Sequence, residues 1–250
     1  MKFYVSVAFR ETKEAIEIAR AADDLGYAGI GIPDHVVNLE TLATPYPYTR
    51  DGERRWEPFT DWPDPWVLVG AIAQVTTRLK FVTTVYIPAM RDPYAAAKAI
   101  GTAAYISDGR VELGIGVGWC EEEFALMGQK FERRGKRTDE MLELFRALWE
   151  PGWTEFSGEF YQTPRLEMEP TPPRIPIYVG GLSEVALRRA ALDSVAGCSI
   201  CVLRGDANRR TGRPGHKRLR RVLVGSPPLV AHFRCCGLHE QTQAGPSSSG

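Results

Sequence analysis

His35 is the side chain whose type and position in this sequence best suit acid–base chemistry. It follows Pro33 and Asp34 directly after an apolar segment, 28–32, which we interpret as a buried β-strand. Enzymes built on α/β barrels place their reacting groups at the carboxyl ends of the strands. An imidazole with its ordinary pKa of about 6.5 takes up and releases a proton near neutral pH. A lone histidine at such a position is more often structural, so the sequence leaves both interpretations open.

A second candidate is the glycine-rich segment 110–119, RVELGIGVGW. On a strand, where side chains alternate between faces, one face carries Val111, Leu113, Ile115 and Val117 and the other carries Glu112, Gly114, Gly116 and Gly118. A strand face without side chains allows a ligand or another backbone to come very close. We weigh a flat ligand and plain close packing equally on this segment alone. It is not a dinucleotide-binding fingerprint, because Trp119 stands where G-x-G-x-x-G needs its third glycine.

Gly180 and Gly181 form a third candidate. They end an apolar segment, 175–179, and precede a helix that we expect to start at Ser183. A glycine turn that opens a helix directs backbone N–H groups and the positive end of the helix dipole at an anion. The alternative is an ordinary strand-to-helix connection. The sequence contains no P-loop and no G-x-S-x-G motif, and Cys120 has no obvious histidine partner.

Strand and helix patterns alternate along most of the chain. Apolar strand patterns cover 2–8, 28–32, 79–87, 111–117 and 175–179, and helical spacing follows at 12–25, 66–76, 95–106, 141–148 and from 183 onward. We interpret 121–134 as a charged excursion and 153–173 as a hairpin insertion. Five strand–helix units without polar alternation in the strands indicate an α/β fold with a parallel sheet covered by helices. An open doubly wound sheet and a (β/α)8 barrel both fit.

The segment 38–65 interrupts this rhythm with aromatic residues and prolines. A connection of this length without secondary structure is usually functional or disordered, and its five aromatic side chains argue against disorder. We interpret it as an ordered flap over a pocket, with a simple cap on the domain as the alternative.

Composition indicates a soluble, cytoplasmic protein. The chain has 250 residues and a formal net charge of zero, so nothing global indicates nucleic acid. No segment reaches the roughly 20 apolar residues of a membrane span. Five cysteines without a secretion signal make a disulfide framework unlikely to be the organising principle of the fold.

Taken together, these segments resemble the luciferase-like monooxygenase and coenzyme F420-dependent oxidoreductase family. The resemblance rests on LGYAGIGIPDH at 25–35, AQVTTRL at 73–79, TVYIPAMRDP at 84–93 and ISDGRVELGIGVGW at 106–119, then on Glu123-Phe124, segment 134–140 and PIYVGG at 176–181. It extends from Met1 to about Ala191.

The resemblance implies a (β/α)8 TIM barrel of the bacterial luciferase-like type, with coenzyme F420 at the carboxyl ends of the strands. FMN, used with dioxygen by a monooxygenase, is the alternative cofactor, and no metal is implied. His35 would be the catalytic acid–base while a hydride moves between the ring and a small organic substrate. The implied cofactor-binding residues are Asp34, His35, Thr83, Thr84, Val85, Gly116, Val117, Gly118, Trp119, Gly180, Gly181 and Ser183. Expected partners are a small-molecule substrate and, as one assembly, a homodimer, without nucleic acid or membrane.

Residues 192–250 do not match that family. This basic tail is rich in arginine, cysteine and proline, and only 222–224 and 229–233 resemble strands. Zinc binding by Cys198 and Cys201 with later histidines or cysteines, a nucleic-acid arm and a solvated tail are alternatives. We favour a shifted reading frame, since out-of-frame GC-rich coding sequence yields such a composition. We therefore expect a barrel domain over 1–191, an atypical tail that is frameshifted or disordered, a barrel incomplete at its C-terminus and impaired activity. A non-catalytic or damaged family member is a further alternative.

Overall fold

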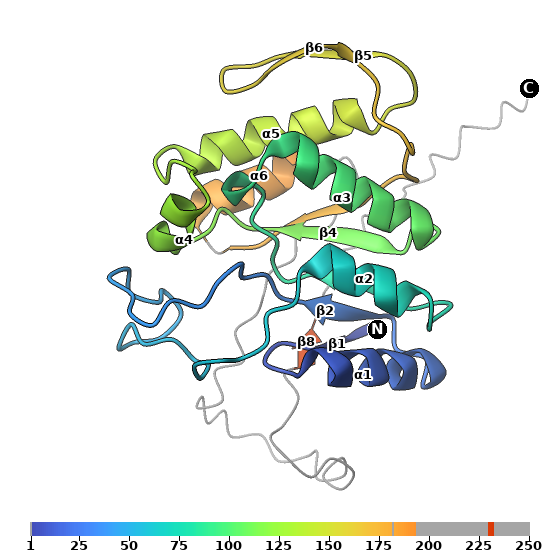
Figure 1. The fold of residues 1–250 in the computed structure, drawn as a ribbon, viewed down its shortest axis with the longest axis vertical. Helices are drawn as coiled ribbons and strands as arrows, with labels where there is room; N and C mark the ends of the chain where they lie inside the picture. Colours follow the sequence, from blue (N-terminus) through green and yellow to red (C-terminus); the bar gives the residue numbers. More distant parts are fainter. Residues whose placement is uncertain (1, 182, 194–229, 233–250) are drawn as a thin grey trace, which may run out of the picture.

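One six-stranded β-sheet organises the part of the chain that the structure describes (Figure 1). The computed structural model describes residues 2–181, 183–193 and 230–232. The strands are β1 (Phe3–Ser6), β2 (Gly29–Ile32), β3 (Lys80–Thr83), β4 (Val111–Ile115), β7 (Ile177–Val179) and β8 (Val230–His232). Their order is β7-β4-β3-β2-β1-β8. The first five are parallel and adjacent in chain order, whereas β8 pairs antiparallel with β1.

Helices connect the parallel strands and cover the sheet. They are α1 (Thr12–Asp24), α2 (Pro65–Ala73), η1 (Pro88–Met90), α3 (Pro93–Ile106), α4 (Glu121–Leu126), α5 (Arg134–Leu148) and α6 (Glu184–Asp193). Figure 1 shows α1, α2, α3 and α5 side by side, and each contacts the next. Apolar strand residues such as Ile30, Phe81, Leu113 and Ile115 share one core with them. These successive β/α units confirm the predicted α/β fold of the TIM-barrel kind.

The structure differs from the sequence prediction at two places: the connection after β4 and the end of β3. Segment 121–134, expected as a charged excursion, begins with the short helix α4. Its first turn carries three glutamates, and negative charge there suits the positive end of a helix. Strand β3, expected over 79–87, ends at Thr83 because the chain bulges there.

In the tail, the strand expected at 229–233 is confirmed by β8, and the other predictions for 194–250 lie outside the described residues.

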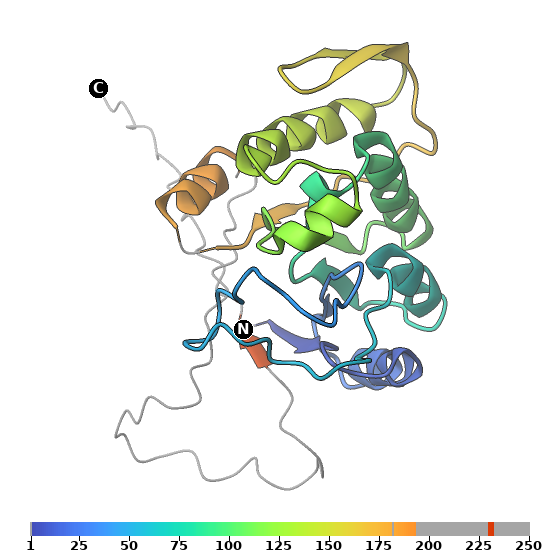
Figure 2. The same ribbon diagram turned by 60° about the vertical axis from the view of Figure 1, so that its left-hand side comes forward.

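The predicted hairpin is confirmed as β5 (Thr154–Ser157) and β6 (Gln162–Leu166), which project beyond α5 (Figures 1 and 2). The main attachment to α5 is the Glu140 carboxylate, beside the Thr154 hydroxyl, which donates to the Ala147 carbonyl at 2.7 Å. Glu140 accepts hydrogen bonds from the backbone N–H groups of Glu159 (2.8 Å), Phe160 (2.8 Å) and Tyr161 (2.7 Å). The hairpin is therefore an appendage of α5 and not part of the main sheet.

The flap, residues 38–64, joins β2 to α2 without helix or strand but is ordered by specific hydrogen bonds. Arg54 donates to Asn38 Oδ1 at 2.8 Å. Asp61 accepts from the backbone N–H (2.8 Å) and the hydroxyl (2.9 Å) of Thr12, so the flap caps the first turn of α1. Both views place the flap beside α4 (Figures 1 and 2). None of the helices in the described part of the chain is long and apolar enough to cross a membrane.

A buried carboxylate, Asp23, joins the end of α1 to the start of β3. It accepts from the backbone N–H groups of Thr77 (2.8 Å), Arg78 (3.0 Å) and Leu79 (2.8 Å) and from the Thr77 hydroxyl (3.1 Å). Burial alone would raise the pKa of Asp23, but these hydrogen bonds outweigh it and lower the pKa below its ordinary value. The folded state therefore stabilises the ionised form of this side chain.

The end of β3 forms a β-bulge that fixes how β3 meets β4. The Thr83 hydroxyl donates to the Gly114 carbonyl (2.7 Å) and accepts from the Gly114 N–H (2.9 Å). Thr84 and Val85, joined by a cis peptide bond, leave the ladder with β4, and Tyr86 rejoins it by donating to the same carbonyl at 2.8 Å. On the other side, the Thr84 N–H still donates to the Ile32 carbonyl of β2 at 2.7 Å. A β-carbon on Gly114 would lie 2.0 Å from the Thr83 carbonyl oxygen. The bulge therefore requires glycine at position 114.

Replacing Asp23 with alanine should lower the free energy of unfolding by about 3 kcal/mol at pH 7, because the backbone N–H groups of Thr77, Arg78 and Leu79 lose a charged acceptor. The pKa of Asp23 is lower in the folded than in the unfolded state. Its contribution is therefore complete above the unfolded pKa of about 3.9 and disappears as the pH falls through the folded value. Urea titrations from pH 7 to pH 3.5 measure this. Asp24→Ala, one residue along and exposed, is the control and should change little. Equal losses in both variants would contradict the assignment.

Gly114→Ala should destabilise the protein by about 3 kcal/mol, the upper end of typical overpacking costs, because its β-carbon meets backbone that cannot rotate away. The matched control is Gly70→Ala in α2, where the nearest atom would be 3.6 Å away. That change should stabilise the helix by roughly 0.5–1 kcal/mol, since alanine is the better helix former. Thermal unfolding of both variants measures the difference, and similar behaviour would mean that the contact with Thr83 is not restrictive.

Candidate functional site

The predicted site residues gather at one edge of the sheet. Because the five strands β1 to β4 and β7 are parallel, their carboxyl ends lie at the same edge. His35 follows β2, the bulge at 84–85 follows β3, segment 116–119 follows β4, and 180–181 follow β7. The edge therefore unites segments that are up to about 150 positions apart in the sequence.

The bulge residues lie over glycines of three neighbouring strands. A β-carbon on Gly116 would lie 2.7 Å from Val85 Cγ2, and one on Gly180 would lie 2.8 Å from Val85 Cγ1. On β2, Gly31 would have Thr84 Cγ2 at 3.4 Å. Close packing therefore accounts for the bare face of β4 at Gly114 and Gly116, one of the two interpretations open at the sequence level. The surface that remains available at this point is that of the bulge.

His35 is bound to α4 through a hydrogen bond with Glu123. Its Nδ1 lies 2.8 Å from Oε2 of Glu123, and the side chains of the two residues are 14% and 3% exposed. The second carboxylate oxygen, Oε1, accepts from the backbone N–H of Val36 (2.9 Å) and Val37 (3.4 Å). Burial would raise the pKa of Glu123, but His35 and the two N–H groups outweigh it and lower that pKa. His35 Nε2 has no hydrogen-bond partner among the described residues.

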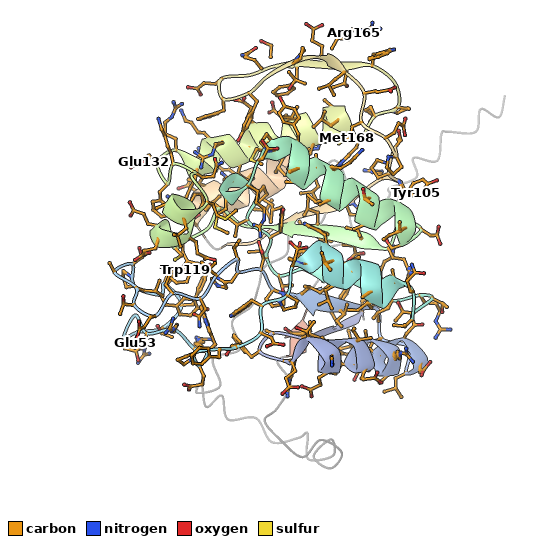
Figure 3. All side chains as sticks on the ribbon, in the orientation of Figure 1. Glu53, Tyr105, Trp119, Glu132, Arg165 and Met168 are labelled. Carbon is orange, nitrogen blue, oxygen red and sulfur yellow. The ribbon has the colours of Figure 1, made fainter. Side chains whose placement is uncertain are left out.

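Three indole rings surround the His35 imidazole. Ring centroids lie 4.7 Å away for Trp62, 4.9 Å for Trp56 and 5.9 Å for Trp119. Tyr46 extends the cluster by contacting Trp56 and Trp119 at 5.3 and 5.1 Å. Figure 3 labels Trp119, which lies between α4 and the flap. Aromatic rings at these separations and inclined to one another pack favourably, so the flap and the end of β4 together hold the imidazole.

Asp34 has a structural partner. It forms a two-pronged ion pair with Arg91 (2.6 and 2.9 Å) and accepts from the Ile87 N–H at 3.0 Å. Burial disfavours the guanidinium, but Asp34 more than offsets it and the pKa of Arg91 is raised. Arg91 also lies over the Tyr86 ring at 4.3 Å. Asp34 therefore ties the end of β2 to the segment after the bulge, and this contact leaves its carboxylate occupied.

The neighbours of Glu123 on α4 have different roles. Glu122 accepts from the backbone N–H groups of Ala43 (2.6 Å) and Thr44 (2.9 Å) in the flap. Burial would raise the pKa of Glu122, but hydrogen bonds from Thr44 and Ala43 outweigh it and lower it to about 2. Burial raises the pKa of the Cys120 thiol to about 12, so Cys120 is not a thiolate nucleophile at neutral pH.

The turn after β7 has the geometry of a helix entrance. Gly181 has φ of +133°, a conformation that glycine adopts without strain. Ser183 Oγ accepts from the Ala186 N–H at 3.2 Å and so caps the first turn of α6. The Gly180 N–H is already used, because it donates to the Ile115 carbonyl at 2.7 Å. Of the three residues predicted to contact a phosphate, two retain a donor that is not bonded to any residue the structure describes: the Gly181 N–H and the Ser183 hydroxyl hydrogen.

Sequence reasoning did not assign a role to Glu123, Trp56 or Trp62. Glu123 stood in a matched motif, but it is 88 positions from His35, and no sequence spacing predicts their contact. The flap was predicted as a pocket cover without naming which rings would face His35. Within the described ranges, no group of three or more histidine, cysteine, aspartate or glutamate side chains could hold a metal ion.

Solved structures with the same fold include two oxidoreductases. Monooxygenase RslO1 from Streptomyces bottropensis aligns with a TM-score of 0.59 at 23% identity, over 72% of this chain and 53% of that one. An F420-dependent secondary alcohol dehydrogenase in complex with an F420–acetone adduct aligns with a TM-score of 0.61 at 21% identity, over 76% and 56%. The chain thus spans about half the length of these structures.

The sequence comparisons indicate a family. An uncharacterized protein of Mycobacterium tuberculosis is 40% identical over 192 residues, 76% of this chain and 67% of the relative. An F420-dependent glucose-6-phosphate dehydrogenase of Amycolatopsis mediterranei is 27% identical over 185 residues, 71% and 50%. The luciferase-like monooxygenase model matches residues 1–194. The chain therefore belongs to the luciferase-like monooxygenase family.

Proposed function

We propose that the chain is a coenzyme F420-dependent oxidoreductase that moves a hydride between the deazaflavin ring and a small organic substrate. The observation that carries this proposal is His35. It stands at the carboxyl edge of the sheet with one ring nitrogen bound to Glu123 and the other without a protein partner in the described part of the chain. The named relatives and structures that use F420 support the choice of cofactor.

The residues at this edge fit a phosphorylated cofactor with a flat ring. Val85 offers an apolar surface at the bulge, beside Gly116 and Gly180. At the other end, Gly181 and Ser183 open α6, and the positive end of a helix suits a phosphate group. Thr84, Val117, Gly118 and Trp119 complete the cofactor-binding set that we assign. Asp34 and Thr83, which the resemblance also implied, are buried and bound to Arg91 and Gly114, so they would support this set from behind. When bound, the deazaflavin would supply a two-electron acceptor or donor for a hydride.

His35 would move the accompanying proton. Oxidation of a substrate carbon that carries a hydroxyl or amino group releases a hydride from carbon and a proton from the heteroatom. The free nitrogen of His35 is the group that takes up this proton, and it returns the proton when the reaction runs toward reduction. An imidazole is suited to both directions because its ordinary pKa lies near neutral pH.

The aromatic cluster gives the site its apolar lining. Trp56, Trp62 and Trp119 pack around His35. Trp62 Nε1 is a buried donor that has no hydrogen-bond partner among the residues the structure describes. These rings would exclude water from the imidazole and pack against an apolar part of the substrate. The Trp62 N–H could donate to a substrate oxygen, which would compensate a buried donor that is otherwise costly.

Cofactor choice is testable by direct binding. F420 at 100 times its dissociation constant should add about 2.7 kcal/mol to the free energy of unfolding. This should raise the melting temperature by roughly 5–10 °C for a chain of this size. Quenching of tryptophan fluorescence measures the same binding, because Trp119 is assigned to the cofactor site. Binding of FMN alone would favour the FMN-dependent monooxygenase, and binding of neither would indicate a non-catalytic family member.

His35→Gln should lower kcat by about 10²–10⁴-fold, the usual contribution of a general acid–base, with little change in F420 affinity. Turnover is followed by the absorbance of F420 with any substrate that the wild type accepts. The cofactor titration on the same variant is the control for folding and binding. Undiminished turnover in a variant that binds F420 would show that His35 does not transfer the proton.

A further inference from the structure

Glu123 is the buried group through which α4 reaches the predicted acid–base residue. Its side chain is 3% exposed, and both carboxylate oxygens are used on the same short segment. Oε2 contacts His35 Nδ1 at 2.8 Å, while Oε1 accepts from the Val36 N–H at 2.9 Å and the Val37 N–H at 3.4 Å. The carboxylate therefore binds both the imidazole and the backbone of the two residues that follow His35, which restricts rotation of the ring.

An ionised carboxylate determines where the imidazole carries its proton. It has only acceptor sites, so the ring nitrogen that faces it must carry a hydrogen. In neutral His35 that nitrogen is Nδ1, which leaves the lone pair on Nε2. The environment keeps Glu123 ionised, because three donors converge on it and outweigh the cost of its burial.

We propose that Glu123 is a positioning residue that holds His35 as the Nδ1-protonated tautomer, so that Nε2 exchanges the proton with the substrate. This rests on the proposed function for its catalytic consequence, whereas the tautomer itself does not. The proton taken from the substrate heteroatom goes to Nε2, and the imidazolium formed is stabilised by the facing carboxylate. A bound deazaflavin would supply the two-electron acceptor for the hydride.

The other ionisable groups around His35 cannot replace Glu123. Asp34 interacts electrostatically with His35, but it is paired with Arg91 through two hydrogen bonds. Glu122 is next to Glu123 on the same helix and binds the N–H groups of Ala43 and Thr44 instead. Glu122 is therefore a matched control: the same side chain, on the same helix, with the flap but without the imidazole as its partner.

Glu123→Gln separates charge from shape. The amide oxygen can still accept from Val36, which turns the amide NH2 toward His35 Nδ1. A donor in that position requires a lone pair on Nδ1, so the hydrogen of neutral His35 moves to Nε2. The same replacement in the serine protease triad, an amide for the orienting carboxylate, imposes the wrong tautomer and lowers kcat by about 10⁴-fold.

The tautomer is measured on the full-length protein without cofactor. Nitrogen-15 NMR of histidine-labelled protein at pH 8.5 distinguishes protonated from unprotonated ring nitrogens, and His35→Gln identifies the His35 signals among the four histidines. The wild type should show a protonated Nδ1, Glu123→Gln a protonated Nε2, and Glu122→Gln the wild-type pattern. A protonated Nδ1 in Glu123→Gln, or a protonated Nε2 in the wild type, would overturn the proposal.

Turnover tests the catalytic consequence. With F420 and a substrate that the wild type accepts, Glu123→Gln should lose about 10²–10⁴-fold in kcat. The acid limb of its pH–rate profile should move to lower pH because the negative charge facing the imidazole is gone. Glu122→Gln should leave that limb in place. An altered tautomer with normal kcat would overturn the positioning role, whereas the expected tautomers without wild-type turnover would refute the F420 function and leave the Glu123 assignment standing.

A second variant covers the case in which Glu123→Gln does not fold. Glu123→Asp keeps the negative charge but is one methylene shorter. It should retain the protonated Nδ1 and the wild-type acid limb, with a kcat loss smaller than that of His35→Gln. If Glu123→Asp folds and shows a protonated Nε2, the carboxylate does not set the tautomer.

Discussion

The contact between Thr83 and Gly114 is the constraint on which the carboxyl edge of the sheet depends. The Thr83 hydroxyl replaces the missing ladder bonds by binding both the N–H and the carbonyl of Gly114. This lets Thr84 and Val85 leave the strand and lie over the neighbouring strands, where Gly31, Gly116 and Gly180 have no side chains to obstruct them. Bulges commonly redirect a strand next to functional sites. Here the bulge packs against Gly31, Gly116 and Gly180, and Val85 presents an apolar surface above them.

Three carboxylates hold connections that the sheet itself does not reach: one is buried (Asp23), one is partly buried (Glu140) and one is exposed (Asp61). Asp23 fixes the entry to β3, Asp61 attaches the flap to α1, and Glu140 attaches the hairpin to α5. Each binds backbone N–H groups of a segment far away in the sequence. For a buried acceptor such as Asp23, hydrogen bonds to the charged group contribute roughly 1.5–3 kcal/mol each, more than neutral ones, so a single side chain can order an irregular segment. The long flap is ordered in this way without helix or strand.

Helix α4 binds both the segment at His35 and the flap through neighbouring glutamates. Glu122 holds the far part of the flap and Glu123 holds the segment at His35, so the position of the imidazole and the position of the flap depend on the same turn of helix. The indoles of Trp56 and Trp62 come from the flap, and that of Trp119 comes from the end of β4. A histidine that looks isolated in the sequence is therefore surrounded by groups from three separate segments. Such a constellation, in which one ring nitrogen has no partner in the described part of the chain, suits the acid–base role that we propose for His35.

The sequence by itself determined the alternation of strands and helices, the parallel sheet, the hairpin and the edge at which His35 and Gly181 lie. These follow from local periodicity, turn residues and the rule that parallel strands share their carboxyl ends. Only the tertiary structure decided what the glycines of β4 face, because the shape of the β3 bulge is a property of two strands and not of one. It also decided the partner of His35. Glu123 and His35 are 88 positions apart in the sequence. Three consecutive glutamates begin the short helix α4, and the local sequence does not predict which of them is buried. That choice depends on how α4 packs against the flap, which exists only after the chain has folded.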